Sequence, residues 1–406
     1  MTNPILAIDG GKPVCKEFLP YGQQWLDEAD IQAVVDVLRG KFITQGPKIA
    51  EFENKVAHYA GAKYAVAFSS GTAALHGACF AAGIQSGDEV ITTPLTFAAS
   101  SNCVLYCGGT PVFADVKSDT YNIDPTDILK KVTPKTKAII PVDFTGQPVQ
   151  IDAIMQIAKQ ANENAANREL VVIHDAAHSL GASYKGRKIG AWADMTMFSF
   201  HPVKHVTTAE GGIIVTDNEE YYQRMLLFRS HGITKDPKQL HQTDQGDWYY
   251  EMQVLGYHYR MTDMQAALGI SQMNKLDGFV TRRREIANQY NEAFRGLPGV
   301  ILPTTLNEAE SSWHLYILQF DPAYTRVNRN DLFAALKAEN LGVNVHYIPV
   351  YLQPYYQSLG YAKGHCPNAE HIYERIITIP LFPKMSDEDV HNVIAAVKKV
   401  HAAYYM

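Results

Sequence analysis

Short apolar segments rich in β-branched residues alternate with amphipathic segments through much of this chain. Segments 89–93, 138–142 and 171–174 are typical of buried strands, and the apolar residues of 151–162 have helical spacing. Because consecutive parallel strands need a crossover connection, the alternation predicts a mainly parallel sheet with helices on both faces. We therefore expect an α/β fold.

The 406 residues exceed the usual size of a single hydrophobic core. We expect an N-terminal arm over residues 1–21, a large domain over 22–295 and a small C-terminal domain over 296–406. An amphipathic helix at 27–39 should open the large domain, and a long helix over 263–295 should lead into the small one.

Two further segments lead to separate structural predictions. Residues 313–320 should form a strand of the small domain. The segment 236–247 is polar and rich in Gln and Asp, so we expect a mobile loop near the substrate.

Lys204 is the first candidate for covalent chemistry. It lies between the apolar run 197–200 and the glycine pair 211–212. Aromatic and apolar neighbours can desolvate an amine and make it a Schiff-base nucleophile at neutral pH, whereas a surface lysine stays protonated and hydrated. Most lysines are solvated surface charges, so this stretch alone is weak evidence for a catalytic lysine. The residues upstream of it strengthen the prediction.

Upstream, the apolar run 170–173 leads to the carboxylate of Asp175. The carboxyl ends of strands in open α/β sheets form the ligand crevice. A carboxylate that faces a pyridine nitrogen keeps it protonated, so that the ring can act as an electron sink. The alternative is that Asp175 caps a following helix. His174 and His178 have the spacing of a metal-ligand pair, but no third ligand lies nearby, and we expect no metal site.

Residues 67–75 predict a strand that turns into an Ala-rich helix, whose N-terminal amides could bind phosphate. Gly71 allows close approach of the backbone, and Thr72 adds a hydroxyl group. The glycine spacing at 40–48 fits neither a Walker A loop nor a dinucleotide fingerprint. Phe97 follows a strand that ends at a proline, and it could lie on an aromatic ring or belong to the core.

Taken together, these motifs resemble those of the DegT-type sugar-nucleotide aminotransferases, which are fold-type I pyridoxal-phosphate enzymes. The shared features are the Ser-Gly-Thr helix start, the Thr-Phe loop, the acid followed by His178, and Ser-Phe-His-x-x-Lys before Glu-Gly-Gly. The resemblance runs from 9–11 to 379–383. It implies a large domain with a mainly parallel, seven-stranded type of sheet flanked by helices, and a smaller C-terminal α/β domain.

The resemblance also implies roles for single residues. Lys204 would form the Schiff base with pyridoxal 5′-phosphate and later move the proton, and Asp175 would pair with the pyridinium nitrogen. His178 would lie near the cofactor. The remaining cofactor contacts would be Gly71, Thr72, Ala73 and Ser199 at the phosphate and Phe97 on the ring.

One position departs from the family pattern. Where His258 stands, the family usually has an Asn that reaches the cofactor phosphate of the partner subunit. The resemblance therefore implies a homodimer with shared active sites. A histidine can still donate one hydrogen bond, so His258 remains a candidate cofactor contact from the partner subunit.

A finer resemblance lies in residues 342–356 and in the His-Pro-Val-Lys form of the lysine motif. Both are similar to the branch of the family that serves pseudaminic acid synthesis. That branch implies transfer of an amino group from L-glutamate to a UDP-linked 4-keto-6-deoxy N-acetylhexosamine. His346 and Tyr347 would line the substrate pocket, and the alternative is a hydrophobic strand that leads to a proline-rich turn.

Three other functions remain open at this point. The substrate could be another 4-keto nucleotide sugar, linked to UDP or dTDP. A pyridoxal-dependent sugar dehydratase has a similar fold, but that branch replaces the lysine with histidine, whereas this chain keeps Lys204 ahead of His205. A non-catalytic sugar-nucleotide binder could also use the fold.

Composition and charge limit the partners and the cellular location that we expect for the protein. The net charge is −6 and the basic run 282–284 fits a solvated helix face, so we expect no nucleic-acid partner. The five cysteines have no C-x-x-C spacing and fit the reduced thiols of a cytoplasmic protein. With no signal-peptide pattern and no apolar run near ~18 residues, we expect a soluble protein that does not bind membranes.

Overall fold

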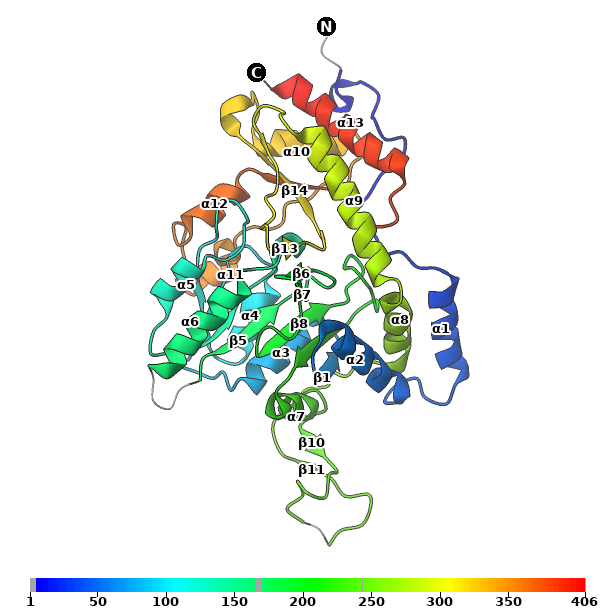
Figure 1. Ribbon diagram of the computed structural model, residues 1–406, viewed down its shortest axis with the longest axis vertical. Helices are drawn as coiled ribbons and strands as arrows, with labels where there is room; N and C mark the ends of the chain where they lie inside the picture. The colour runs from blue at the N-terminus through cyan, green and yellow to red at the C-terminus, as the bar shows by residue number, and fades with distance from the viewer. Residues whose placement is uncertain (1–4, 165–168, 243, 406) are drawn as a thin grey trace.

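A computed structural model describes residues 5–164, 169–242 and 244–405. Its centre is a seven-stranded sheet in the order β1-β9-β8-β5-β4-β2-β3 (Figure 1). Strand β9 is antiparallel to β1 and β8, and every other neighbouring pair is parallel, which confirms the mainly parallel sheet. The strands are β1 (Tyr64–Phe68), β2 (Glu89–Thr92), β3 (Thr110–Phe113), β4 (Thr136–Ile140), β5 (Val171–Asp175), β8 (Met195–Ser199) and β9 (Gly212–Thr216).

Helices cover both faces of this sheet. Alternate residues of β5 enter different cores: Val172 belongs to the core that contains Phe52, and Ile173 belongs to the core that contains Leu75. One core includes α2 (Pro47–Ala60), α6 (Ile151–Glu163) and α8 (Asp263–Met273), and the other includes α3 (Gly71–Ala81), α4 (Ala99–Tyr106) and α7 (Glu219–Phe228). A short helix, α5 (Pro125–Lys131), follows β3, and a small sheet joins β6 (Ser183–Tyr184), β7 (Arg187–Lys188) and β13 (Ala309–Glu310).

A second core lies beyond the central sheet. There β12 (Val300–Ile301), β14 (Tyr316–Phe320) and β15 (Ile376–Ile379) form an antiparallel sheet, beside α9 (Leu276–Phe294), α10 (Arg329–Ala338) and α13 (Asp387–Tyr404). Its buried cluster includes Tyr290 and Leu318, and it takes Leu6 and Leu19 from the N-terminal segment. The domain limits at 21 and 295 remain predictions.

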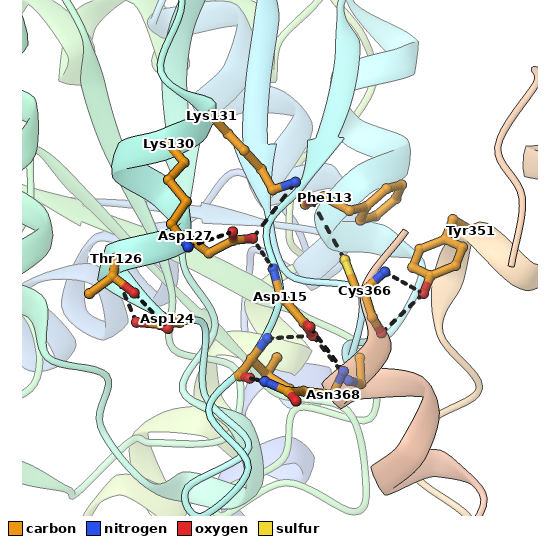
Figure 2. A network of polar contacts seen from close by, with 12 residues as sticks. Phe113, Asp115, Asp124, Thr126, Asp127, Lys130, Lys131, Tyr351, Cys366 and Asn368 are labelled. Carbon is orange, nitrogen blue, oxygen red and sulfur yellow. Dashed lines mark hydrogen bonds and ion pairs between the residues drawn. The ribbon is translucent and has the colours of Figure 1, made fainter. Parts of the chain in front are cut away.

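Asp115, which follows β3, links the central sheet to helix α12 (Pro367–Tyr373) in the C-terminal part of the chain. Its carboxylate accepts hydrogen bonds from the backbone amides of Asn368 and Ala369, at 2.9 and 3.0 Å, and so caps α12 from the end of β3 (Figure 2). The Asn368 side chain also donates to the carbonyl of Val116. These contacts hold α11 (Pro354–Ser358), α12 and the segment before them against the large sheet.

The predicted helix over 263–295 is wrong, because α8 and α9 are separate helices with a break at residues 274–275. Side chains beside the break contact α1 (Glu28–Arg39): Gln272 Nε2 lies 2.7 Å and Lys275 Nζ 2.5 Å from Asp30 Oδ2. Such tertiary contacts leave no mark on helical periodicity. Helix α1 itself starts after Asp27, whose side chain caps it, close to the predicted boundary.

A hairpin of β10 (Ile233–Thr234) and β11 (Glu251–Met252) projects from the body below α7 (Figure 1). The polar segment 236–247, of which residue 243 lies outside the described residues, forms part of its tip. Trp248, between the two strands, is 70% exposed, and Leu255, which follows β11, is 76% exposed. Among the described residues, the helices lack one that is long and apolar enough to cross a membrane.

Candidate active site

The predicted catalytic residues meet at the carboxyl ends of the central strands. Asp175 is the last residue of β5, and Lys204 lies in the turn that follows the neighbouring strand β8. Their charges lie close enough to influence one another's pKa. His178 follows Asp175 in a turn, so the alternative in which Asp175 caps a helix does not hold.

Asp175 is buried and hydrogen-bonded. Ser100 Oγ donates to its Oδ2 at 2.6 Å, and the Ala177 amide donates to its Oδ1 at 3.1 Å. Burial raises the pKa of Asp175 above its ordinary value, while these hydrogen bonds and the charge of Lys204 oppose that rise. Ser100 lies in the first turn of α4, and no sequence motif distinguished it from an ordinary helical serine.

The Lys204 amine is enclosed although the residue as a whole is only partly buried. Its Nζ lies 3.4 Å from Nε2 of His314. Burial lowers the pKa of Lys204 to about 8; the negative charge of Asp175 opposes this effect and the positive charge of Arg283 adds to it. The amine is therefore uncharged far more often than that of a surface lysine.

Three histidines surround this lysine. The ring centroid of His314 lies 4.3 Å from that of His178 and 5.7 Å from that of His205. Burial lowers the pKa of all three well below the ordinary value, so they are neutral at pH 7. His314 comes from the chain just before β14, more than a hundred residues from the lysine motif, and sequence reasoning missed it.

The start of α3 forms a cradle against the end of β8. A Cβ atom at Gly71 would lie 3.2 Å from Cβ and 3.3 Å from Oγ of Ser199, so glycine permits this close approach. The amides of Gly71 and Thr72 have no acceptor inside the helix. The Ala73 amide donates to the capping oxygen of Ser70 at 3.1 Å. Together the amides of Gly71 and Thr72 and the hydroxyl groups of Thr72 and Ser199 suit a phosphate.

Phe97 and the 346–347 pair border the same region. Phe97 is 62% exposed, so it is not a core residue, and its ring centroid lies 6.4 Å from that of Tyr347. The Tyr347 hydroxyl lies 3.4 Å from His178 Nε2. His346 is buried behind it, with Nδ1 2.9 Å from the Thr378 hydroxyl and its ring 5.1 Å from that of Tyr21. Tyr347, rather than His346, therefore reaches the histidine cluster.

His258 lies on exposed chain after the projecting hairpin. It pairs with Ser230 in an isolated bridge, and its ring centroid lies 5.5 Å from that of His231. These contacts belong to the outer surface beside α7 and not to the lysine cluster of the same subunit.

A metal site finds no support in the described part of the chain, where no group of three or more His, Cys, Asp or Glu side chains gathers in a suitable arrangement. The two histidines considered as a ligand pair have different partners. His174 Nε2 lies 2.7 Å from Asp143 Oδ1, whereas His178 contacts Tyr347.

Both the sequence and the fold of this chain are similar to those of known proteins. The model of the DegT/DnrJ/EryC1/StrS aminotransferase family matches residues 24–398. The spore coat polysaccharide biosynthesis protein SpsC of Bacillus subtilis is 44% identical over 385 residues, which are 94% of this chain and 97% of that protein.

Two solved structures are similar over nearly their whole length. One is Helicobacter pylori PseC, an aminotransferase involved in the biosynthesis of pseudoaminic acid, with 32% identity, a TM-score of 0.87, and coverage of 95% of this chain and 100% of that one. The other is the PLP-form of the putative sugar aminotransferase Spr1654 from Streptococcus pneumoniae, with 34% identity, a TM-score of 0.87, and coverage of 95% and 98%.

Proposed function

This chain belongs to the DegT/DnrJ/EryC1/StrS aminotransferase family, and from that premise we propose its substrate and the roles of its site residues. It is a fold-type I, pyridoxal-phosphate-dependent sugar aminotransferase, as the sequence motifs implied. The proposed amino acceptor is a UDP-linked 4-keto-6-deoxy N-acetylhexosamine. L-glutamate is the proposed donor, and the product is the corresponding 4-amino sugar.

The proposed substrate is supported by the similarity to PseC, and the position of Tyr347 agrees with it. Tyr347 belongs to the 342–356 motif on which the finer resemblance rests, and its hydroxyl lies 3.4 Å from His178. A substrate bound above Lys204 would therefore contact this motif. His346 supports the tyrosine from behind through its ring contact, at 4.8 Å between centroids.

The residues present fit pyridoxal 5′-phosphate. The cradle of Gly71, Thr72 and Ser199 suits its phosphate, Phe97 offers a free aromatic face, and the buried carboxylate of Asp175 suits a protonated ring nitrogen. His178 Nδ1 is buried without a partner in the described structure and is available to a polar group of the cofactor. When bound, the cofactor takes up the electron pair that is left when Cα of the amino acid loses its proton.

Lys204 performs the proton transfer in this proposal. With a pKa of about 8 instead of 10.5, roughly one tenth of its amines are neutral at pH 7, about 300 times the fraction of an ordinary lysine. A neutral amine is both the nucleophile that bonds to the cofactor and the base that removes a proton from carbon. Because this amine is buried, the proton is shielded from solvent until it is delivered.

In this proposal Asp175 would stay ionised and would keep the ring nitrogen of the bound cofactor protonated. Burial alone would favour its neutral form, and the hydrogen bonds from Ser100 and Ala177 counteract that effect. A buried carboxylate needs such donors to remain charged. Ser100 is in turn bonded to the Thr96 hydroxyl at 2.7 Å, which fixes its rotamer.

We propose a homodimer in which His258 of one subunit approaches the cofactor phosphate of the other. The projecting hairpin and the residues just after it support this, because Trp248, Met252 and Leu255 are more than half exposed and would be covered by a partner. All five cysteines are free thiols, four of them buried, which fits the proposed cytoplasmic location.

A substrate panel tests the function. Purified protein with L-glutamate is offered 4-keto nucleotide sugars that differ in the N-acetyl group and in the nucleotide, and each product is identified by mass spectrometry. We expect preferential amination of the UDP-linked N-acetyl sugar. Preference for a sugar without the N-acetyl group, or for a dTDP sugar, would replace the proposed substrate, and loss of water without amination would indicate a dehydratase.

Borohydride trapping tests the assigned lysine separately. The native protein should show a visible absorbance band that borohydride removes, and peptide mapping should find the reduced adduct on Lys204. Lys185, which is paired with Asp152 at 2.7 Å outside the site, serves as a matched control lysine. An adduct on any lysine other than Lys204 would overturn the assignment.

A further inference from the structure

His314 is held in place by contacts on both sides of it in the chain. Arg283 of α9 donates to the carbonyls of Trp313 and His314, each at 3.2 Å. The Ser312 hydroxyl donates to the His178 carbonyl at 2.9 Å, and the Leu315 amide donates to the Thr145 carbonyl at 3.2 Å. The backbone of this segment is therefore fixed against both domains.

This anchoring directs the imidazole at the reactive lysine. His314 is 4% exposed, and its Nε2 lies 3.4 Å from Lys204 Nζ. Its other ring nitrogen, Nδ1, is buried and has no hydrogen-bond partner in the described structure. In the described structure, the polar contact of the His314 ring is therefore the one between Nε2 and Lys204.

The unpartnered Nδ1 favours one tautomer. A buried N–H group without an acceptor is rarer in proteins than an acceptor that lacks a donor, so the proton is better placed on Nε2. An Nε2–H group can donate to the lone pair of a neutral amine, but it cannot accept from an ammonium group. The positive charge of Arg283 and the buried setting disfavour an imidazolium. The contact is therefore selective for uncharged Lys204.

We propose that His314 is a positioning residue that stabilises the neutral form of the Lys204 amine, and so raises its neutral fraction, when the lysine is not bonded to the cofactor. The proposal rests on Lys204 being the cofactor lysine of the proposed function. The charged and titratable groups around the amine are Asp175 from β5, Arg283 from α9, and the rings of His178, His205, His201 and His346. Without His314, Asp175 would attract the amine in its charged form.

The proposal is tested by measuring the reactivity of Lys204 in the full-length apoprotein. Competitive labelling with acetic anhydride from pH 6 to 10, read by mass spectrometry of the Lys204 peptide, gives the titration midpoint and the neutral fraction. His314→Phe keeps a ring but removes the donor. Loss of one net hydrogen bond should lower the labelling rate at pH 7 by about three- to tenfold and move the midpoint upward.

His314→Gln is the matched control, because its amide can reach the position of Nε2 and donate from it. It should restore the labelling rate to within about twofold, an effect that loss of packing alone would not produce. If His314→Phe does not fold, His314→Asn, whose amide is too short to reach Lys204, takes its place. In the holoenzyme, His314→Phe should lower kcat for the half-reaction with L-glutamate and leave KM nearly unchanged.

An unchanged midpoint and labelling rate in a folded Phe or Asn variant would overturn the role of His314. That outcome is distinct from failure of the proposed function, since borohydride trapping of the wild-type protein identifies the cofactor lysine independently. An adduct on another lysine would remove the basis of both proposals.

Discussion

Replacing Lys204 with methionine should stabilise the folded apoprotein near neutral pH. Burial lowers the pKa of Lys204 from 10.5 to about 8, which means that the folded protein opposes protonation of this amine. Since one pKa unit corresponds to about 1.4 kcal/mol, the charged lysine should lower the free energy of unfolding by roughly 3 kcal/mol. Methionine has similar length, carries no charge and removes this penalty.

The sign of the pH dependence follows from the same pKa. Between pH 8 and 10.5 the unfolded chain binds more protons at this site than the folded protein does, so wild-type stability should rise with pH in that window. The penalty is complete below pH 8 and absent above pH 10.5. The stability difference between Lys204→Met and wild type should therefore shrink from about 3 kcal/mol at pH 7 towards the packing difference alone.

Urea unfolding of both apoproteins at equal concentration, followed by circular dichroism at several pH values, measures this difference. Equal concentration matters because a dimer gains stability with concentration. Lys16→Met, at an exposed lysine, controls for the general loss of a positive charge. A difference between Lys204→Met and wild type that stays constant from pH 7 to 10.5 would refute the buried, destabilising charge.

Three further outcomes are expected. Asp175→Asn should retain cofactor yet lose most turnover in steady-state assays, because a neutral amide cannot hold the ring nitrogen protonated; near-normal turnover at matched occupancy would contradict this role. Ser100→Ala removes a charge-assisted bond of about 1.5–3 kcal/mol to Asp175 and should raise the acidic limb of the kcat profile by roughly 1–2 pH units, whereas an unmoved limb would count against it. His258→Ala should remain dimeric by light scattering and bind the cofactor up to about tenfold more weakly, since a single hydrogen bond is worth about 1 kcal/mol; an active monomer would exclude shared sites.

Local sequence patterns were sufficient for much of the fold. The apolar run before Asp175 predicted a buried strand, and β5 occupies it with alternate side chains in two cores. Amphipathic spacing predicted a helix over 27–39, and α1 covers Glu28–Arg39 after the capping residue Asp27. Both features depend on interactions between residues close together in the chain, so one sequence carries them.

The wrong predictions, a single helix over 263–295 and a strand starting at 313, lie where tertiary contacts shape the chain. Asp30 on α1 contacts Gln272 and Lys275 beside the break between α8 and α9, which periodicity cannot reveal. The predicted strand 313–320 begins only at Tyr316, because Trp313 has a positive φ of 51° and the preceding chain bonds to the large domain. The three residues excluded from the strand include His314.

The irregular start of that strand also connects stability with reactivity. A regular strand through residue 314 would alternate its side chains across the small sheet and could not also bond its backbone to Gly146 and Thr145 of the large domain. By leaving the strand, the segment brings His314 to Lys204. The buried guanidinium of Arg283 then holds the backbone carbonyl of His314, although its pKa is lowered to about 9 by burial and three carbonyls are its only acceptors in the described structure. An arginine in so unfavourable a setting is best explained by the position it imposes on the histidine beside the reactive amine.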